Sequence, residues 1–299
     1  MKTSSAHFVD VRGLRYHVRT WGDPGAPKLY MLHGWMDVGA SFQFLVDALS
    51  REWHVIAPDW RGFGGSEWCS DGYWFADYLG DLDVLLDHFS GDAPARLLGH
   101  SLGGNVVMLY AGVRPERVER VVSLEGFGIP AEASERAPDK LAKWLDALAM
   151  PPAFRPYANL DAVADQLQKN NPRLSRDRAI FLAGHWARVE PDGSARLVSD
   201  PRHKLPTATV YRMEEIVAVW KRVRAPVLWV AATESFIPKW LAAHPEGEAA
   251  TDALSAVRAR IAHIPQATLA SVSEAGHMLH LDRPESVAAL IEPFFAPPP

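Results

Sequence analysis

The residues with the clearest chemical potential are Gly99-His100-Ser101-Leu102-Gly103-Gly104, which follow an apolar run and precede a helical pattern. They contain the spacing G-x-S-x-G. A nucleophilic serine on a sharp strand-to-helix turn leaves no room for side chains two positions away, so both flanking positions are glycine. The following helix offers backbone N–H groups to developing negative charge. The strand–turn–helix setting therefore favours a nucleophilic Ser101 over a chance glycine-rich turn.

A serine hydroxyl needs a base to become a nucleophile. His277, in Glu274-Ala275-Gly276-His277-Met278, lies in a short loop after the last expected strand and before the final helix. In the chain order nucleophile, acid, histidine, this is the expected place of the base. His280 is the nearest alternative. We predict that His277 takes the proton of Ser101.

A second glycine-containing turn, His33-Gly34-Trp35, also ends an apolar strand. The glycine lets a ligand approach the backbone closely, so the N–H groups of Trp35 and Leu102 are predicted to form an oxyanion hole. The side chains of Trp35, Phe127 and His33 are expected beside the substrate. For His33, a structural hydrogen bond within the turn is the alternative.

The segment Asp59-Trp60-Arg61-Gly62-Phe63-Gly64-Gly65-Ser66 resembles a functional loop but is interpreted as structural. Asp59 and Arg61 are expected to hold the turn after a strand, and the glycines make it tight. The segment lacks the G-x-x-x-x-G-K-[ST] spacing of a phosphate-binding loop.

Short apolar runs alternate with helical patterns in the first half of the chain, which predicts a mostly parallel sheet covered by helices. Residues 126–222 then read as helices and turns, and the strand pattern resumes at Val227. The expected strands are Leu14–Trp21, Lys28–Leu32, Trp53–Ala57, Ala95–Leu98, Val118–Leu124, Val227–Ala232 and Thr268–Val272. The expected helices include Ser41–Leu49, Tyr73–Phe89, Asn105–Gly112, Asp139–Ala149, Leu160–Lys169, Ser175–Val189, Met213–Val223 and Pro284–Phe295.

Together with Leu281-Asp282-Arg283-Pro284 after Gly276-His277, these motifs resemble the α/β-hydrolase fold superfamily, specifically its capped serine hydrolases. The resemblance covers nearly the whole chain. It implies a core domain formed by residues 1–126 and 223–299, and a helical cap formed by residues 127–222 over the catalytic face. Basic residues of the cap, Arg155, Arg173 and His185, are expected on its solvated surface.

The acid departs from the pattern of most relatives, in which an aspartate follows the strand before the last. Here that stretch reads Ala231-Ala232-Thr233-Glu234-Ser235-Phe236-Ile237-Pro238, so a glutamate takes the aspartate's place. A second carboxylate, Glu125, ends the preceding strand, which is similar to one subgroup of haloalkane dehalogenases. Either glutamate can orient an imidazole. The sequence leaves both open, with a slight preference for Glu125.

The expected reaction is hydrolysis of a carboxylic ester or a related acyl bond of a small, largely apolar substrate, as in a carboxylesterase. Haloalkane dehalogenases and epoxide hydrolases of this fold use an aspartate at the elbow, so Ser101 argues against both. Three alternatives stay open: a C–C bond hydrolase acting on diketones of the meta-cleavage type, a small-molecule receptor with slow turnover, and oxygen or peroxide chemistry without a cofactor.

Composition excludes several other classes. The chain has 299 residues, 48% of them hydrophobic, and 31 Lys+Arg against 36 Asp+Glu, which gives no basic surface for nucleic acid. It has no apolar run of membrane-spanning length, and Met1–Asp10 lacks the apolar segment of a signal peptide. One cysteine and the absence of H-E-x-x-H spacing predict no metal centre and no cofactor. We therefore expect a cytoplasmic monomer or homodimer that acts on a small molecule.

Overall fold

Eight strands form one sheet in the order β1-β2-β4-β3-β5-β6-β9-β10 in the computed structural model, which describes residues 1–243 and 254–296. The six strands from β4 to β10 run parallel, whereas β1 and β2 are antiparallel additions at one edge. The strands are β1 Ser4–Val11, β2 Leu14–Trp21, β3 Lys28–Leu32, β4 His54–Pro58, β5 Ala95–His100, β6 Val118–Leu124, β9 Val227–Ala232 and β10 Ala267–Val272.

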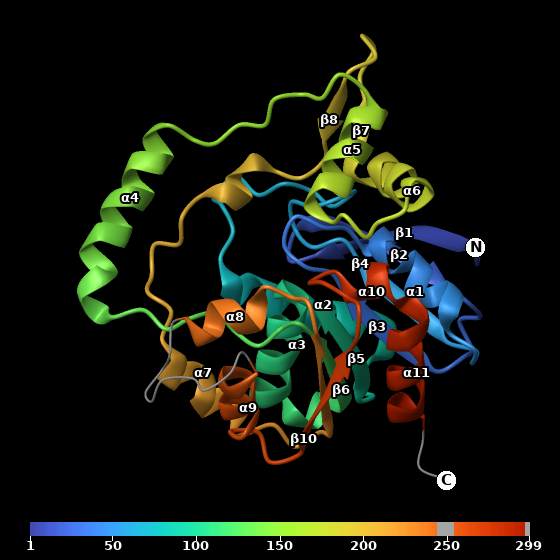
Figure 1. Cartoon of the computed structure of the whole chain (residues 1–299), viewed down its shortest axis with the longest axis vertical. Helices are drawn as coiled ribbons and strands as arrows, with labels where there is room; N and C mark the ends of the chain where they lie inside the picture. The colour runs from blue at the N-terminus through green and yellow to red at the C-terminus, as the bar shows by residue number, and fades with distance from the viewer. Residues whose placement is uncertain (244–253, 297–299) are drawn as a thin grey trace.

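Helices cover both faces of this sheet (Figure 1). Helices α1 (Gln43–Ala48), α10 (Leu279–Asp282) and α11 (Pro284–Phe295) bury residues against one face. Helices α2 (Phe75–Ser90), α3 (Leu102–Val113), α7 (Met213–Trp220), α8 (Ile237–Ala242) and α9 (Ser255–Ile261) bury residues against the other. Among the described residues, no helix combines the length and the apolar character that crossing a membrane requires.

The central strands explain why the sheet needs both helical layers. Along β9, Val227, Trp229 and Ala231 pack into one buried cluster, while the intervening side chains pack into the other. Every residue of this strand is buried. Successive side chains of a strand point to opposite faces, so a strand that is apolar throughout requires a partner layer on each side. The predicted fold class, a mostly parallel sheet flanked by helices, is confirmed.

Several elements lie outside the predicted set. Strand β1 was not predicted because it is an edge strand with mostly exposed side chains; its Phe8 is 53% exposed. The expected helix Ser175–Val189 ends earlier, as α6 (Arg176–Trp186), and continues as the short strand β7 (Ala187–Val189), which pairs with β8 (Ala195–Leu197). The short helices α8 and α10 follow loops at strand ends. Each has too few residues to show a repeating apolar pattern, so neither was predicted.

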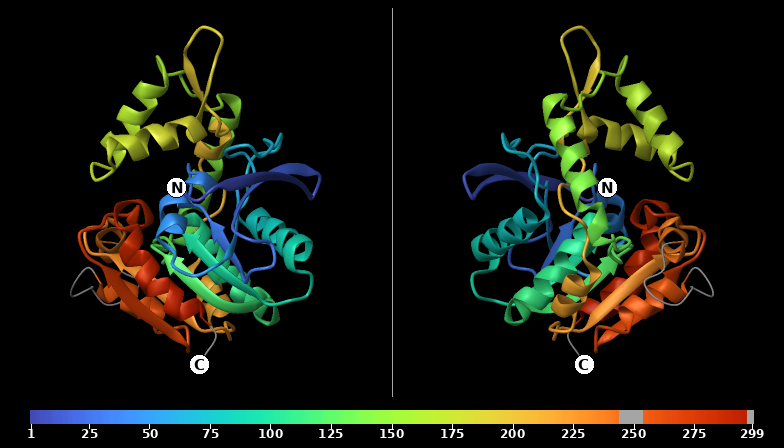
Figure 2. Two further views of the ribbon diagram at one scale, coloured as in Figure 1. Left: turned by 90° about the vertical axis from the view of Figure 1, so that its right-hand side faces the viewer. Right: turned by 90° about the vertical axis from the view of Figure 1, so that its left-hand side faces the viewer.

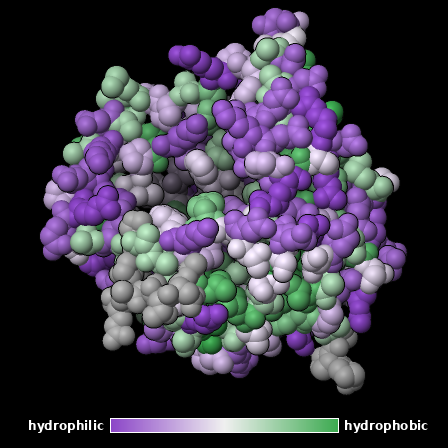
Figure 3. All heavy atoms as spheres, in the orientation of Figure 1, coloured by the Kyte–Doolittle hydropathy of each residue, from purple (hydrophilic) through white to green (hydrophobic). Residues whose placement is uncertain are grey.

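The segment between β6 and β9 covers the carboxyl ends of the parallel strands (Figures 1 and 2). We call residues 129–212 the lid. Its helices α5 (Leu160–Asn170) and α6 enclose a small apolar core with β7 and β8. Helix α4 (Ala137–Ala149) lies to one side, on the left in Figure 1, and has no buried residue. The surface of the lid that faces the viewer in Figure 3 is mainly hydrophilic.

Two parts of the predicted cap, residues 127–222, pack with the sheet instead. Phe127 is fully buried against Trp229 of β9, with ring centroids 5.6 Å apart. Helix α7 buries Met213 and Trp220 in the same core cluster as α3. The helix joins the core because its apolar side chains face the sheet layer. Phe127 and α7, at the two ends of the segment predicted as the cap, thus pack against the core sheet.

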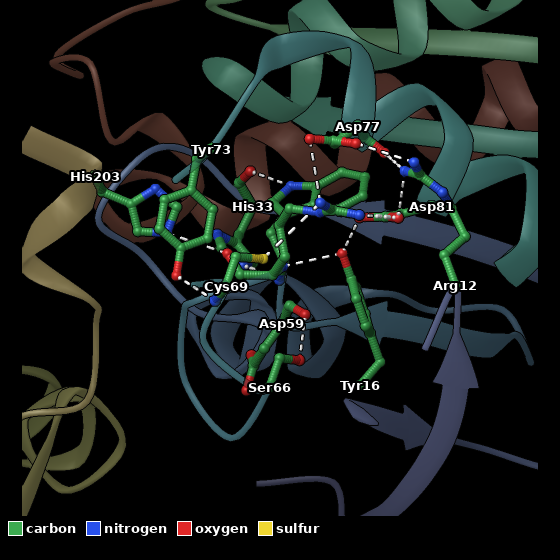
Figure 4. A network of polar contacts seen from close by, with 12 residues as sticks. Arg12, Tyr16, His33, Asp59, Ser66, Cys69, Tyr73, Asp77, Asp81 and His203 are labelled. Carbon is green, nitrogen blue, oxygen red and sulfur yellow. Dashed lines mark hydrogen bonds and ion pairs between the residues drawn. The ribbon is translucent and has the colours of Figure 1, made fainter. Parts of the chain in front are cut away.

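The turn after β4 is held by the polar network drawn in Figure 4. Asp59 accepts hydrogen bonds from the backbone N–H groups of Gly39 at 2.7 Å and Gly65 at 2.9 Å. Arg61 donates to the fully buried carboxylate of Asp81, at 2.5 Å from Nε and 2.6 Å from Nη2. Two parallel bonds between a guanidinium and a carboxylate fix their relative orientation. The structure thus gives both residues the turn-holding contacts that the sequence suggests.

Candidate active site

Ser101 occupies the sharp turn between β5 and α3. Its backbone lies in the left-handed half of conformational space, with φ 52° and ψ −112°, which is strained for a residue with a side chain. A Cβ added to Gly99 would lie 2.2 Å from the carbonyl oxygen of Gly103, and one added to Gly103 would lie 2.1 Å from that of Leu32. The glycines are therefore required by close backbone packing on both sides of the serine.

Three side chains from separate loops meet at this turn. Ser101 Oγ lies 3.0 Å from His277 Nε2, and His277 Nδ1 lies 3.3 Å from an Oε of Glu125. His277 comes from the loop between β10 and α10, and Glu125 directly follows β6. The arrangement places a hydroxyl, an imidazole and a carboxylate in hydrogen-bonding order.

Glu125 is held rigidly where it faces the histidine. Its side chain is fully buried, its φ is 58°, and its backbone N–H donates to the carbonyl of Val230 at 3.0 Å. One carboxylate oxygen accepts from the backbone N–H of Ala232 at 2.6 Å. The other, which faces His277, also accepts from the hydroxyl of Ser235. These donors give both buried carboxylate oxygens a hydrogen-bond partner and fix the orientation of the side chain.

Glu234 points elsewhere. Its side chain is 50% exposed and forms an ion pair with Arg173 of the lid. Within the described residues, the carboxylate that lies within 4 Å of a ring nitrogen of His277 belongs to Glu125. The two glutamates left open by the sequence therefore have different surroundings: one faces the imidazole, and the other links the lid to the core.

The backbone segments expected to form the oxyanion hole lie on either side of Ser101. The turn at Gly34 packs directly on the nucleophile, since a Cβ added there would lie 3.2 Å from Ser101 Cβ. Leu102 is the first residue of α3, where backbone N–H groups have no acceptor within the helix. The N–H of Trp35 follows the same turn. The structure thus places both residues beside the turn of Ser101, and their role as an oxyanion hole stays a prediction.

The three residues expected beside the substrate have different positions. Trp35 is 52% exposed and lines the cavity over Ser101, where its Nε1 donates to the carbonyl of His203 at 3.2 Å. His33 is fully buried: its Nε2 accepts from the N–H of Trp60 at 2.8 Å, so its Nδ1–H donates to the carbonyl of Gly34. His33 therefore holds the turn rather than the substrate.

Phe127 also lies outside the cavity. Its ring packs in the core under the sheet, so the expectation that it contacts substrate is corrected. The sequence placed it beside Glu125, but the backbone at Gly126 directs it inward. A Cβ added to Gly126 would lie 2.7 Å from backbone atoms of Gly104.

The cavity over Ser101 has a volume of about 630 Å³ and a mostly apolar wall formed by the lid and the core. Leu167, Leu182 and Trp186 contribute apolar surface from the lid. Arg173 and Glu234 supply charge at the wall, and Arg173 is exposed to solvent there, as the sequence predicts. A pocket of this size and character suits a small, largely apolar ligand with few polar groups.

Sequence reasoning did not identify Ser235 as a partner of the site. Its hydroxyl donates to Glu125 from the loop in which most relatives carry the acid. Ser235 directly follows Glu234 in the sequence, but a serine in a loop does not by itself indicate a role in a site. Only the adjacency of β6 and β9 brings the two loops together.

Buried histidines make the stability of the fold depend on pH. Burial lowers the pKa of His33 to about 4 and those of His203 and His280 to about 3, and it also lowers the pKa of His100. Below pH 6.5 the unfolded chain binds protons that these folded histidines do not bind. We expect the free energy of unfolding to fall by about 1.4 kcal/mol per pH unit for each histidine. Burial raises the pKa of Asp37 to about 6. Its folded carboxylate therefore binds a proton at a higher pH than in the unfolded chain, which opposes the effect, but Asp37 is one group against four histidines.

Urea unfolding between pH 7.5 and pH 5 measures this dependence. The variant His280→Gln should show a shallower pH slope than the wild type, because one buried site no longer titrates. His88→Gln, at an exposed position, is the matched control and should leave the slope unchanged. A free energy of unfolding that stays constant from pH 7 to pH 5 would contradict the prediction.

The fold and the site together define a class of protein. A parallel sheet of this order, a serine on a strained strand–helix turn, and a histidine after the last strand are the architecture of an α/β hydrolase. The model of the alpha/beta hydrolase fold family matches residues 27–284, and the chain belongs to that family.

Relatives and solved structures agree with this assignment. A serine hydrolase-like protein of Danio rerio is 28% identical over 93% of this chain and 84% of its own length. Lipase LipV of Mycobacterium tuberculosis is 27% identical over 94% of this chain and 98% of its own. The hypothetical protein PA1622 of Pseudomonas aeruginosa has a solved structure with a TM-score of 0.83 and 27% identity, covering 98% of this chain and 99% of that one.

Proposed function

We propose that this α/β hydrolase cleaves a carboxylic ester or a related acyl bond through an acyl-enzyme, with Ser101, His277 and Glu125 as its catalytic triad. The observation that carries the proposal is the continuous contact from Ser101 Oγ to His277 Nε2 at 3.0 Å and from His277 Nδ1 to Glu125 at 3.3 Å. Nucleophile, base and orienting acid have these mutual positions in serine hydrolases of unrelated folds.

In the first half of the reaction, Ser101 Oγ attacks the acyl carbon, and His277 Nε2 takes the hydroxyl proton. The carbonyl oxygen becomes an oxyanion, to which the N–H groups of Trp35 and Leu102 donate. His277 then gives its proton to the leaving alcohol, and an acyl-Ser101 ester is left. Glu125 keeps the imidazole oriented and stabilises its positive charge.

In the second half, a water molecule replaces the alcohol. His277 takes a proton from the water as it attacks the acyl carbon, and then returns a proton to Ser101 Oγ as the acid leaves. The apolar wall of the 630 Å³ cavity supports a small, largely apolar acyl or alcohol group as substrate. The charged pair Arg173–Glu234 offers polar contacts at one side of that wall.

A substrate panel tests the proposal. p-Nitrophenyl acetate and butyrate, lactones and a dienoic diketone are assayed with the purified protein, and the first turnover is followed by rapid mixing. We expect ester turnover to exceed diketone turnover, and a burst of p-nitrophenol equal to the enzyme concentration wherever deacylation is the slower step. Faster cleavage of the diketone would identify a C–C bond hydrolase. Tight ligand binding with almost no turnover would identify a receptor.

A further inference from the structure

Four buried polar atoms without a hydrogen-bond partner gather behind the nucleophile. They are Asp37 Oδ2, His100 Nδ1 and both ring nitrogens of His280. All three side chains are almost completely shielded from solvent. Buried polar groups are normally satisfied, because leaving one unpaired costs free energy comparable to a lost hydrogen bond. One ligand atom from each of the three residues lies close enough to the others to share a bound species.

The protonation of the cluster can be deduced from its surroundings. His100 Nε2 lies 2.8 Å from the carbonyl oxygen of His277, which can only accept, so Nε2 carries the hydrogen and Nδ1 carries a lone pair. Asp37 Oδ1 accepts from the N–H of Val38, the hydroxyl of Ser41 and Nε1 of Trp186, which leaves Oδ2 directed at the cluster.

The cluster is therefore rich in acceptors. It presents a carboxylate oxygen, the Nδ1 lone pair of His100 and one ring nitrogen of His280, whose tautomer no hydrogen bond fixes among the described residues. When that nitrogen carries its lone pair, only acceptors face the centre, and the two hydrogens of a water leave one of them unpaired. A cation can accept all three and also offsets the buried charge of Asp37.

We propose that Asp37, His100 and His280 form a binding site for a divalent transition-metal ion such as Zn²⁺. Two neutral imidazoles and one carboxylate are a ligand set that suits such ions rather than Mg²⁺ or Ca²⁺. The site lies outside the triad and does not depend on the proposed ester chemistry. No spacing in the sequence indicates it, because its members come from three distant segments.

The distances fit this proposal. One ligand atom from each residue lies within 4.8 Å of the others, and Asp37 Oδ2 lies 4.0 Å from His280 Nε2. Three atoms this close share a point no more than about 2.8 Å from each of them. Zinc binds nitrogen and oxygen at about 2.0–2.2 Å, so each ligand atom must move by less than ~1 Å.

An ion can reach the site and would act on the catalytic centre. Asp37 and His100 both line the cavity over Ser101, which gives a path from solvent. His100 precedes the nucleophile and holds the backbone carbonyl of His277. Trp186, which donates to Asp37, belongs to lid helix α6. A bound ion would therefore connect the catalytic loops with the lid.

Binding is measured on the full-length protein, freed of metal by a chelator, with Zn²⁺ as the titrant in a calorimeter. We expect saturable binding of one Zn²⁺ per chain at pH 7.5, and a rise in Tm on loading. Cobalt(II) serves as a spectroscopic probe and should give visible d–d absorption with the intensity of a low-symmetry, nitrogen-ligated site. Absence of saturable Zn²⁺ binding at millimolar concentration would overturn the proposal and leave a buried water as the occupant.

Variants locate the ion. His280→Gln and Asp37→Asn should each weaken Zn²⁺ binding by at least ~10-fold. His277→Gln is the matched control, because the catalytic imidazole is the nearest competing ligand, and it should retain wild-type affinity. Binding that is lost in His277→Gln and retained in His280→Gln places the ion at the triad and overturns the proposal. If a ligand variant fails to fold, the cobalt spectrum of His277→Gln decides the question: an unchanged spectrum keeps the ion at the proposed site, and its loss places the ion at the triad.

Discussion

Replacing Ser101 with alanine is expected to lower kcat for p-nitrophenyl butyrate by roughly 10⁴- to 10⁶-fold. The substitution removes the atom that attacks the acyl carbon and that lies 3.0 Å from His277 Nε2. The turn itself is kept, because alanine is no larger than serine. Steady-state kinetics measures the loss. Reaction with a fluorophosphonate, followed by intact mass, should change from one adduct per chain to none.

The matched control is Cys69→Ala, which removes the other side chain that could attack an acyl group. Burial raises the pKa of the Cys69 thiol, which disfavours the reactive thiolate. This variant should retain its kcat and its labelling within about twofold. Persistent labelling of Ser101→Ala would show that another residue is the nucleophile.

Replacing Glu125 with glutamine should lower kcat by about 10³- to 10⁴-fold, whereas Glu234→Gln should change it only a few-fold. A neutral amide beside His277 Nδ1 neither fixes the required tautomer nor stabilises the imidazolium that forms during attack. Glu234 forms its ion pair with Arg173 at a half-exposed position, so its charge is screened by water.

The two substitutions are a matched pair, since each exchanges a glutamate for an amide of the same shape after a strand of the same sheet. Urea unfolding of both variants separates a loss of catalysis from a loss of structure. The reverse order of effects, with the larger loss in Glu234→Gln, would assign the acid to the loop after β9 and would refute the triad proposed above.

Much of the fold could be predicted because its central strands are apolar throughout. The predicted bounds Val118–Leu124 and Val227–Ala232 coincide with β6 and β9. Edge strand β1 could not be predicted in the same way, because its side chains are mostly exposed and carry no apolar period. The packing of α7 against the core could not be predicted either, since helical spacing does not reveal which layer an apolar face contacts.

The site residues also differ in whether local sequence or tertiary contacts determine their positions. Ser101 and His277 could be predicted because local backbone geometry and chain order constrain them. The choice between two glutamates depends on which way each side chain turns at the end of its strand. That direction is decided by tertiary contacts, the Ser235 hydroxyl for one and Arg173 for the other. The cluster of Asp37, His100 and His280 is absent from any linear pattern for the same reason.

Phe127 and its neighbours also determine at which residue the lid could be replaced by the lid of another protein. The chain passes from Glu125 into the lid through Gly126, Phe127 and Gly128, and each is fixed to the core. The carbonyl of Gly126 accepts from Ser123 at 3.1 Å, Phe127 is buried beneath β9, and the N–H of Gly128 donates to Asn105 at 2.8 Å. These contacts fix the backbone that directly follows Glu125, the proposed triad acid. A chimera in which a foreign lid begins at residue 126 would lose these contacts. A chimera with its junction after Gly128 would keep them.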